Sequence, residues 1–271
     1  MQKLQGKVVI ITGSTKGIGK AIAKRFVDEG AKVVVTSSSQ RNVDKAVKEF
    51  PEQSVFGAAC DVANYDDVEK LISETVRRFG RLDVIINNAG VAEPFRRIVD
   101  APLEDWYKPM EINIKGTYHC CRAAIKYFLT VGKGKVINMA GAGTTTNTPY
   151  FSGYGSSKAA IYRMTMALAE EYKGTGVEVM LLNPGLVRTE ILAIDRPTPD
   201  ILKRMETFNK VMDMFAQPPT VAAGLAVKLS SEWSDGKPGV YLNALSKMRA
   251  RKLLATYPFR KMLNKVDRTI Y

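Results

Sequence analysis

A tyrosine and a lysine stand four residues apart, at positions 154 and 158, where the pattern indicates the beginning of a long helix. Residues four apart share one face of a helix, so the phenol and the ammonium can meet. A free tyrosine has a pKa of about 10 and is a poor base at neutral pH, but a nearby cation favours the phenolate. The pair therefore indicates general acid–base catalysis by Tyr154, with Lys158 lowering the pKa of the phenol.

A glycine-rich turn near the N-terminus has the spacing of a phosphate-binding loop. It lies between a short apolar run, Val8–Ile11, and a helical pattern over Ile18–Glu29. Glycines let the backbone approach a pyrophosphate, and the next helix directs N–H groups and a positive dipole end at it. The spacing predicts a dinucleotide site, and the alternative is an ordinary turn between a strand and a helix. The turn reads Thr12-Gly13-Ser14-Thr15-Lys16-Gly17-Ile18-Gly19.

The elements that must position these residues alternate regularly along the chain. Short apolar runs typical of buried strands are separated by helical patterns such as Val43–Phe50, Tyr65–Phe79 and Tyr154–Lys173. This alternation predicts βαβ units in one doubly wound α/β domain, with a parallel sheet of about seven strands flanked by helices, over residues 1–245. A long helical stretch over 103–129 contains Pro109, which predicts a kink or a fresh start. The expected strands are Val8–Ile11, Lys32–Thr36, Ser54–Ala59, Leu82–Ile86, Lys135–Met139, Val177–Leu182 and Val240–Leu242.

Four motifs in this order resemble those of the short-chain dehydrogenase/reductase family. They are Thr-Gly-x-x-x-Gly-Ile-Gly at 12–19, Asn-Asn-Ala-Gly at 87–90, Tyr-x-x-x-Lys at 154–158 and Pro-Gly at 184–185. The resemblance implies a Rossmann fold and hydride transfer between a nicotinamide cofactor and a carbonyl or secondary alcohol. In that chemistry Tyr154 would move the proton and Lys158 would hold the nicotinamide ribose.

The resemblance also assigns residues that would hold the dinucleotide. Asp61 and Val62 would flank the adenine, and residues 88–90 would pack beside the adenosine ribose. Val187 and Thr189 would meet the nicotinamide carboxamide. The expected cofactor residues are Gly13, Ser14, Thr15, Lys16, Gly17, Ile18, Gly19, Ser37, Ser38, Arg41, Asp61, Val62, Asn88, Ala89, Gly90, Tyr154, Lys158, Pro184, Gly185, Val187 and Thr189.

The choice between NAD and NADP is made at the end of the second strand in proteins of this fold, where a carboxylate binds the ribose 2′-OH and repels a 2′-phosphate. The matching residues here are Ser37 and Ser38, without a carboxylate. Lys16 and Arg41 are nearby cations that suit a phosphate dianion. We therefore expect NADP(H) to be preferred over NAD(H); in the alternative, the two cations only face solvent.

One residue expected from the resemblance is missing. The family places a serine at the end of the fifth strand, where it donates a hydrogen bond to the substrate oxygen, and the matching residue here is Gly141. Loss of one such donor typically costs about 10²–10³ in rate. Three readings remain open: Thr144 takes the role, the substrate or water supplies a donor, or the protein mainly binds nucleotide. The first is favoured, and Asn113 matches the family's helix asparagine that supports a proton relay through water.

Two segments interrupt the regular pattern. Glu190–Pro219 lies where relatives carry a substrate lid. Its apolar residues predict either a pocket lining or the buried face of a helix pair, and four residues before the catalytic helix could reach the same pocket. The lid residues are Met205, Phe208, Met212, Met214 and Phe215, and the other four are Glu93, Phe95, Tyr150 and Phe151.

The second segment, residues 246–271, is a basic extension with one acid, Asp267. The favoured interpretation is a helical extension that packs on the same or a neighbouring subunit; the alternative is peripheral contact with an anionic membrane. Its basic residues are Lys247, Arg249, Arg251, Lys252, Arg260, Lys261, Lys265 and Arg268.

Composition narrows the class of protein. The 271 residues carry a net charge of +13, which favours anionic partners such as nucleotides, yet no nucleic-acid module is recognised. Three cysteines and one histidine argue against paired disulfides and histidine metal sites, so we expect a cytoplasmic protein without a metal. The resemblance implies a homodimer or homotetramer. The leading function is an NADP(H)-dependent carbonyl reductase or alcohol dehydrogenase. The alternatives are a nucleotide-binding regulatory protein with little turnover and a related lyase, dehydratase or epimerase.

Overall fold

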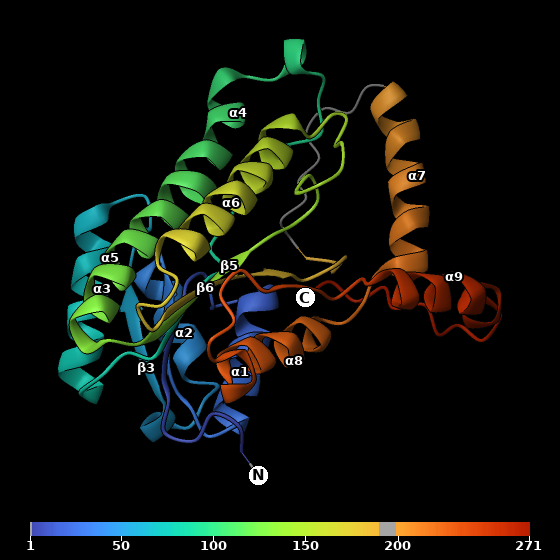
Figure 1. Ribbon diagram of the computed structural model, residues 1–271. Helices are drawn as coiled ribbons and strands as arrows, with labels where there is room; N and C mark the ends of the chain where they lie inside the picture. Colours follow the sequence, from blue (N-terminus) through green and yellow to red (C-terminus); the bar gives the residue numbers. More distant parts are fainter. Residues whose placement is uncertain (1, 190–198) are drawn as a thin grey trace.

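A computed structural model describes residues 2–189 and 199–271, and it contains a parallel sheet of seven strands in the order β3-β2-β1-β4-β5-β6-β7 (Figure 1). The predicted fold class is confirmed. The chain runs outward from β1 to β3 and then returns to place β4 on the other side of β1. Ligands of such sheets bind at this switch point, beyond the carboxyl ends of the strands. The strands are β1 (Val8–Ile11), β2 (Lys32–Ser37), β3 (Val55–Ala59), β4 (Val84–Asn87), β5 (Gly134–Met139), β6 (Val177–Asn183) and β7 (Tyr241–Asn243).

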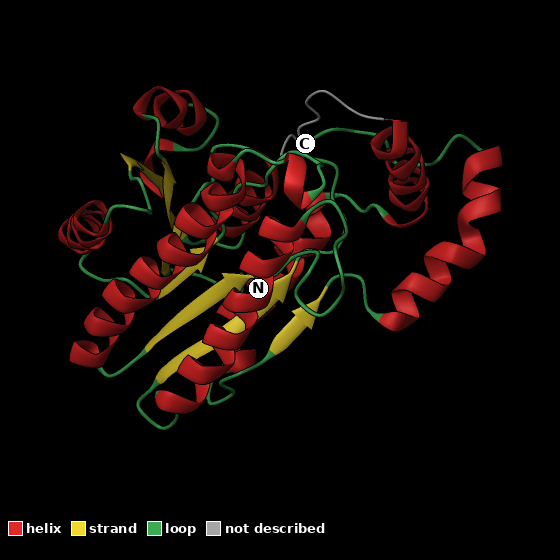
Figure 2. Cartoon of the chain, turned by 90° about the horizontal axis from the view of Figure 1, so that it is seen from above, coloured by secondary structure: helices red, strands yellow, loops and turns green. Residues whose placement is uncertain are grey.

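Helices cover both faces of the sheet (Figure 2). In β1, Val9 and Ile11 face α1 and α8, and Ile10 faces α3 and α5, so the strand is buried on both sides. This explains why the central strands appear in the sequence as continuous apolar runs. The helices are α1 (Gly17–Asp28), α2 (Gln40–Val47), α3 (Tyr65–Phe79), α4 (Leu103–Pro109), α5 (Gly116–Val131), α6 (Ser152–Glu171), α7 (Pro199–Phe215), α8 (Pro219–Ser230) and α9 (Lys247–Met262).

The long helical stretch expected over 103–129 consists of three pieces. Between α4 and α5 the residues Met110–Lys115 form one π-helical segment. Pro109 precedes it and has no N–H to donate, which interrupts the regular ladder of hydrogen bonds. Such wide turns often lie at functional sites, and this one carries Asn113.

Helix α2 begins earlier than the sequence predicted, at Gln40 instead of Val43, and ends at Val47 instead of Phe50. The earlier start is explained by the N-terminal cap, because the Ser39 side chain accepts a hydrogen bond from the N–H of Asn42. Serine favours this position because its oxygen satisfies an N–H that has no partner within the helix.

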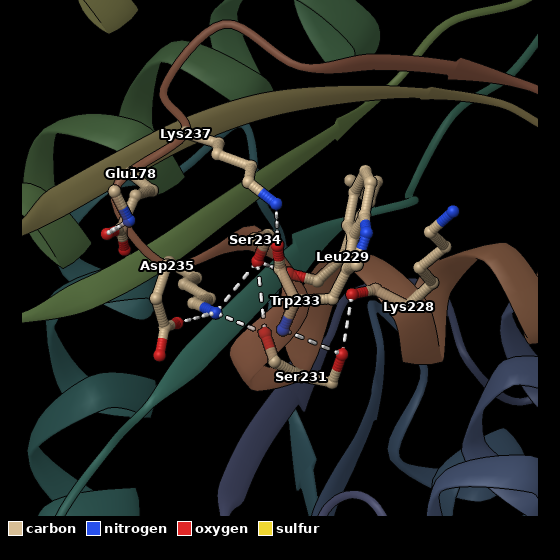
Figure 3. Close-up of polar contacts among 10 residues, drawn as sticks. Glu178, Lys228, Leu229, Ser231, Trp233, Ser234, Asp235 and Lys237 are labelled. Atoms are coloured by element: carbon tan, nitrogen blue, oxygen red, sulfur yellow. Dashed lines mark hydrogen bonds and ion pairs between the residues drawn. The ribbon is translucent and has the colours of Figure 1, made fainter.

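A buried lysine fixes the amino end of β5, at the edge of the sheet opposite the switch point. The Lys135 side chain is 6% exposed and pairs with the Asp235 carboxylate at 2.5 Å. It also donates to the Ser231 carbonyl at 2.6 Å and to Ser234 Oγ at 2.8 Å. Ser234 lies in a short helical turn, η4 (Glu232–Ser234), and Ser231 and Asp235 flank it, as Figure 3 shows. The contacts connect the turn after α8 to the sheet.

Two properties of the described ranges bear on function. No helix within residues 2–189 and 199–271 is both long and apolar enough to cross a bilayer. Over the same residues, no group of three or more His, Cys, Asp and Glu side chains is placed to hold a metal ion.

Candidate active site

A cavity of about 430 Å³ opens at the carboxyl ends of the strands, beside the switch point between β1 and β4. Most of the residues predicted for cofactor binding line it, although they come from distant parts of the sequence. Those residues are Gly13, Thr15, Lys16, Gly17, Ile18, Gly19, Ser37, Ser38, Asp61, Val62, Asn88, Ala89, Gly90, Tyr154, Lys158, Pro184 and Thr189. Residues not predicted also line it: Cys60, Val91, Ala92, Lys108, Ile112, Met139, Ala140 and Tyr271.

The glycine-rich loop needs its glycines for space. A Cβ on Gly13 would lie 2.9 Å from the Ala89 Cα, and one on Gly19 would lie 2.5 Å from the Gly13 carbonyl oxygen. Gly17 adopts φ +57°, and a Cβ there would lie 3.6 Å from Thr189 Cγ2, which also lines the cavity. Glycines at positions 13 and 19 thus let the loop pack directly on Ala89 and on itself, and the loop lines the cavity at the N-terminus of α1. This cradle fits the pyrophosphate of a dinucleotide.

The Asn-Asn-Ala-Gly motif holds this loop in place. The Asn88 amide donates to the carbonyl oxygens of Thr12 and Gly13, at 2.9 and 3.0 Å. The N–H of Ala89 donates to Thr12 Oγ1 at 2.9 Å. Two motifs far apart in the sequence therefore form one hydrogen-bonded unit.

Two of the predicted cofactor residues lie outside the cavity lining at this end. Ser14 is fully buried, and its hydroxyl donates to the Ile11 carbonyl at 2.6 Å and accepts from the Thr36 N–H at 3.1 Å. It therefore holds β1 and β2 together beneath the loop. Arg41 is exposed, in the first turn of α2, while Ser37, Ser38 and Lys16 line the cavity.

The Tyr154 hydroxyl lies where a side chain at position 141 would begin. A Cβ built on Gly141 would overlap Tyr154 Oη and would lie 3.2 Å from Tyr154 Cζ. In this arrangement the missing serine and the tyrosine hydroxyl compete for one space. Sequence comparison alone identifies the missing donor but not the group that fills its place.

Lys158 is 5% exposed, and its ammonium lies 5.6 Å from the centre of the Tyr154 ring. It donates to the Met139 carbonyl oxygen at 3.0 Å. Burial lowers the pKa of Lys158 to about 8. Burial, with a smaller contribution from the Glu93 charge, raises the pKa of Tyr154 to about 12. The spacing of the pair predicted the opposite direction for the phenol, because neither its burial nor the position of Glu93 can be read from that spacing.

Glu93 caps the helix that carries the tyrosine. Its side chain is buried, with one oxygen accepting from the Gly153 N–H at 2.7 Å and the other from the Tyr154 N–H at 2.8 Å. A carboxylate is favourable there because the N-terminus of a helix carries a partial positive charge. Burial raises the pKa of Glu93. The sequence indicated only that Glu93 could reach the pocket.

Asn113 lies behind the cavity and does not line it. Its side chain is fully buried; it donates to the Val91 carbonyl and to Ser157 Oγ, both at 2.9 Å, and accepts from the Val91 N–H at 2.8 Å. Ser157 in turn donates to the Tyr154 carbonyl at 2.7 Å. The asparagine thereby connects the π-helical segment, a wall of the cavity and the tyrosine helix.

Thr144 lies beside Gly141, as the sequence suggested, but its hydroxyl is engaged. Thr144 Oγ1 donates to the Gly141 carbonyl at 2.8 Å and accepts from the Gly141 N–H at 3.1 Å. The residue is 7% exposed and does not line the cavity. Its contacts hold the backbone against which the Tyr154 hydroxyl lies.

The loop after β6 reaches the cavity through Pro184 and Thr189, whereas Gly185 and Val187 lie outside the lining. Gly185 has φ +75° and donates its N–H to Asn183 Oδ1 at 3.0 Å. A positive φ favours glycine, so the Pro-Gly motif sets the direction of this loop.

Aromatic residues extend the site beyond Tyr154. Phe151 lies 4.9 Å from the Tyr154 ring and stacks on Phe95 at 4.8 Å, and Phe95 lies 5.6 Å from Phe208 of α7, all between ring centres. Met205 packs on the same cluster. The cluster joins the predicted lid helix to the catalytic helix. Residues 190–198 of the predicted lid lie outside the described residues.

Tyr271 is a wall of the cavity that the sequence did not predict. Its N–H donates to the Arg188 carbonyl at 2.9 Å. The Arg188 side chain pairs with Asp213 of α7 at 2.5 Å, and Arg268 pairs with the same carboxylate at 3.1 Å. Asp213 therefore holds both the loop after β6 and the last residues of the chain. No signal in the sequence marks this contact, because it joins three distant segments.

A parallel sheet with a glycine-lined cleft at its switch point, and with a Tyr–Lys pair on the helix that follows β5, is the arrangement of oxidoreductases of the Rossmann type. The profile of the short chain dehydrogenase family matches residues 7–200. The chain belongs to this family, whose members act on CH–OH and C=O groups.

Characterised relatives cover most of the chain. An L-fucose dehydrogenase of Bos taurus is 37% identical over 230 residues, which is 84% of each chain. Dehydrogenase/reductase SDR family member 4 of Homo sapiens is 33% identical over 234 residues, 84% of this chain and 82% of its own. A 3-ketoacyl-(acyl-carrier-protein) reductase of Brucella melitensis, solved with NADH, has a TM-score of 0.78 and 27% identity, covering 91% of this chain and 99% of its own.

Proposed function

We propose that this protein is an NADP(H)-dependent oxidoreductase that interconverts a carbonyl and a secondary alcohol, with Tyr154 as the general acid and base. The observation that carries the proposal is the Tyr154 side chain, which lines the same cavity as the glycine-rich loop and Lys158. A proton-transfer group and a dinucleotide cradle therefore share one space.

A bound nicotinamide dinucleotide would supply the hydride in reduction and accept it in oxidation. Tyr154 Oη donates a proton to the carbonyl oxygen in reduction and takes the hydroxyl proton in oxidation. Lys158, 5.6 Å from the ring centre, supports negative charge on the phenol and is expected to hold the nicotinamide ribose. A water relay through Asn113 stays a prediction, because the Asn113 side chain is bonded to Val91 and Ser157.

Preference for NADP(H) is supported by the ribose end of the cavity. Ser37, Ser38 and Lys16 line it, and position 37 carries no carboxylate to repel a 2′-phosphate. Solved structures with the same fold carry either NADP or NADH, so the proposal for this chain rests on its own residues. Matched measurements of kcat/KM should favour NADPH over NADH, and a preference for NADH would reject this part of the proposal.

The test of the reaction is NADPH oxidation followed at 340 nm, with ketones, aldehydes, quinones and steroids; the sugar-oxidising relatives add L-fucose with NADP⁺. The Tyr154→Phe variant should lose at least 10²-fold in turnover, because proton transfer typically contributes 10²–10⁴-fold. NADPH affinity should stay within a few-fold. Equal turnover by the variant would exclude Tyr154 as the proton donor.

We propose that Thr144 takes the role of the serine that is missing at position 141 and supplies the hydrogen-bond donor to the substrate oxygen. Thr144→Val should lower turnover at least tenfold, whereas Thr144→Ser, which keeps the hydroxyl, should stay near the wild-type rate. An unchanged rate in the valine variant would eliminate this role. A threonine that supplies the donor directly would also change KM, whereas one that only holds the Gly141 backbone would leave KM nearly constant and lower kcat.

Two other functions are distinguished by the same assays. Tight NADPH binding without turnover across the panel would favour a nucleotide-binding regulatory protein, which the glycine at position 141 supports. Product formation without net oxidation or reduction would favour a lyase, dehydratase or epimerase. We further propose that the protein is cytoplasmic and forms a homodimer or homotetramer. Light scattering would measure the molar mass and so give the number of subunits.

A further inference from the structure

Helix α9 stands away from the sheet together with α7, and both views of the chain show this (Figures 1 and 2). Its inner side packs on α7: Arg260 donates to the Met214 carbonyl at 2.6 Å, and Leu253 and Tyr257 are partly buried. The sequence analysis favoured this packing as the role of the basic extension. It accounts for only one side of the helix.

The other side of α9 carries an apolar stripe. Met248 is 82% exposed, Phe259 is 65% exposed and Met262 is 75% exposed. With 3.6 residues per turn, positions 248, 255, 259 and 262 fall within a narrow sector of the helix, opposite Leu253 and Tyr257. Exposed methionine and phenylalanine side chains gathered on one side of a helix indicate a surface that binds a partner or a membrane.

Cations flank this stripe. On the helix wheel Lys247 and Arg251 lie along one side and Lys252 along the other, and all three are exposed. Within the part of the chain that the structure describes, no ion pair is found for these three residues. No acidic residue occurs between Ala244 and Val266. Exposed apolar side chains flanked by long basic side chains are a feature of helices that lie in the surface of an anionic bilayer.

We propose that the outer face of α9 docks on an anionic lipid surface, with Met248, Phe259 and Met262 inserted at the headgroup boundary and Lys247, Arg251 and Lys252 facing lipid phosphates and carboxylates. Charge selects this occupant over a second copy of the helix, since two such faces would repel each other. Shape agrees: the helix projects from the body and fits a flat surface. The proposal does not depend on the oxidoreductase activity.

The test is co-sedimentation of the full-length protein with vesicles of phosphatidylcholine alone and with 30% phosphatidylserine, at about 0.1 M salt. We expect about 100-fold stronger partitioning to the anionic vesicles, at about fivefold for each of the three cations. Arg251→Gln with Lys252→Gln should weaken it roughly 25-fold, at about fivefold for each cation. The matched control, Lys70→Gln with Arg78→Gln, removes the same charge from exposed positions of α3 and should partition like the wild type.

A second variant tests the apolar stripe. Met248→Ser with Phe259→Ser and Met262→Ser should lower partitioning at least tenfold, while circular dichroism and NADPH binding stay at wild-type values because these side chains are exposed. Absence of wild-type binding would overturn the proposal, as would equal losses in the α3 control. If the wild type does not bind vesicles and the serine variant dissociates an oligomer, the outer face of α9 contacts a second copy of the chain and the proposal is wrong.

Discussion

The position of the Tyr154 hydroxyl depends on the residue type at position 141. Because a Cβ at position 141 would overlap Tyr154 Oη, the present place of the phenol depends on glycine. Glu93 and Thr144 hold the two sides of this contact, through the Tyr154 N–H and the Gly141 backbone. Glycine at position 141 therefore has two effects. It removes the serine hydroxyl expected from the family resemblance, and it leaves the space that the Tyr154 hydroxyl occupies.

Glu93 should set the pH dependence of alcohol oxidation. Oxidation needs the Tyr154 phenolate, and the Glu93 charge adds to burial in raising the pKa of Tyr154. Glu93→Gln removes that charge, so the pKa of Tyr154 falls and the rising limb of the rate profile moves to lower pH. The measurement is kcat against pH in the oxidative direction. The control is Glu104→Gln, which removes an exposed carboxylate from α4 and should leave the rising limb at its wild-type pH. If Glu93→Gln also leaves the limb at that pH, the Glu93 carboxylate only caps the helix and this prediction is wrong.

At this scale the sequence predicts roles that depend on local spacing and misses those that depend on distant contacts. The glycines at 13, 17 and 19 and the 154/158 pair were identified because their spacing alone implies a loop and a shared helix face. Ser14 was assigned to the cofactor for the same reason, although its hydroxyl joins β1 to β2. The contact between Glu93 and α6 has no local signature.

Among the elements, β5 is held from both ends. Its carboxyl end meets Lys158 through the Met139 carbonyl, and its amino end carries the buried Lys135. Nearby, the ammonium groups of Lys228 and Lys237 lie 3.9 and 4.4 Å from the centre of the Trp233 ring (Figure 3). The strand that supports the catalytic end is thus also tied to the turn after α8.

Lys135→Met should lower the free energy of unfolding by about 2 kcal/mol, because the Ser231 carbonyl loses a buried donor and the hydrogen bond to Ser234 Oγ is removed. Methionine keeps the apolar stem packed, so lost volume contributes little. Urea unfolding measures the change, and Lys133→Met, at an exposed position two residues earlier, is the control. Equal stability of the two variants would show that the contacts of Lys135 contribute nothing.

Element positions were predictable where a strand or helix is buried on a periodic face, as for Val8–Ile11 and Tyr65–Phe79, which the structure reproduces. Boundaries were not, because caps decide them: Ser39 starts α2 three residues early. The π-helical segment at 110–115 also has no periodic signature; only Pro109 indicated an interruption.

At the scale of the whole molecule, Asp213 connects the chain's last residues to the cofactor cavity. Its carboxylate pairs with Arg188 and Arg268, and the Arg188 carbonyl receives the Tyr271 N–H. Asp213→Asn weakens both ion pairs, so amide hydrogen exchange in residues 266–271 should accelerate at least tenfold, since local opening then costs less. Asp44→Asn on α2 provides a comparison. Unchanged exchange at 266–271 would show that other contacts hold the segment.

The order of the strands has a consequence for synthesis of the chain. β1 leaves the ribosome before every other strand, pairs with β2 on one side, and keeps its other edge open until β4 has been made, since Val9 pairs with both Val33 and Val84. Such non-local pairing is slow and leaves apolar strands uncovered. β1 therefore stays unpaired along this edge until residues 84–87 have been made. The cavity lining runs from Gly13 to Tyr271, so the cavity is complete only when residue 271 has been added and has folded back onto the sheet.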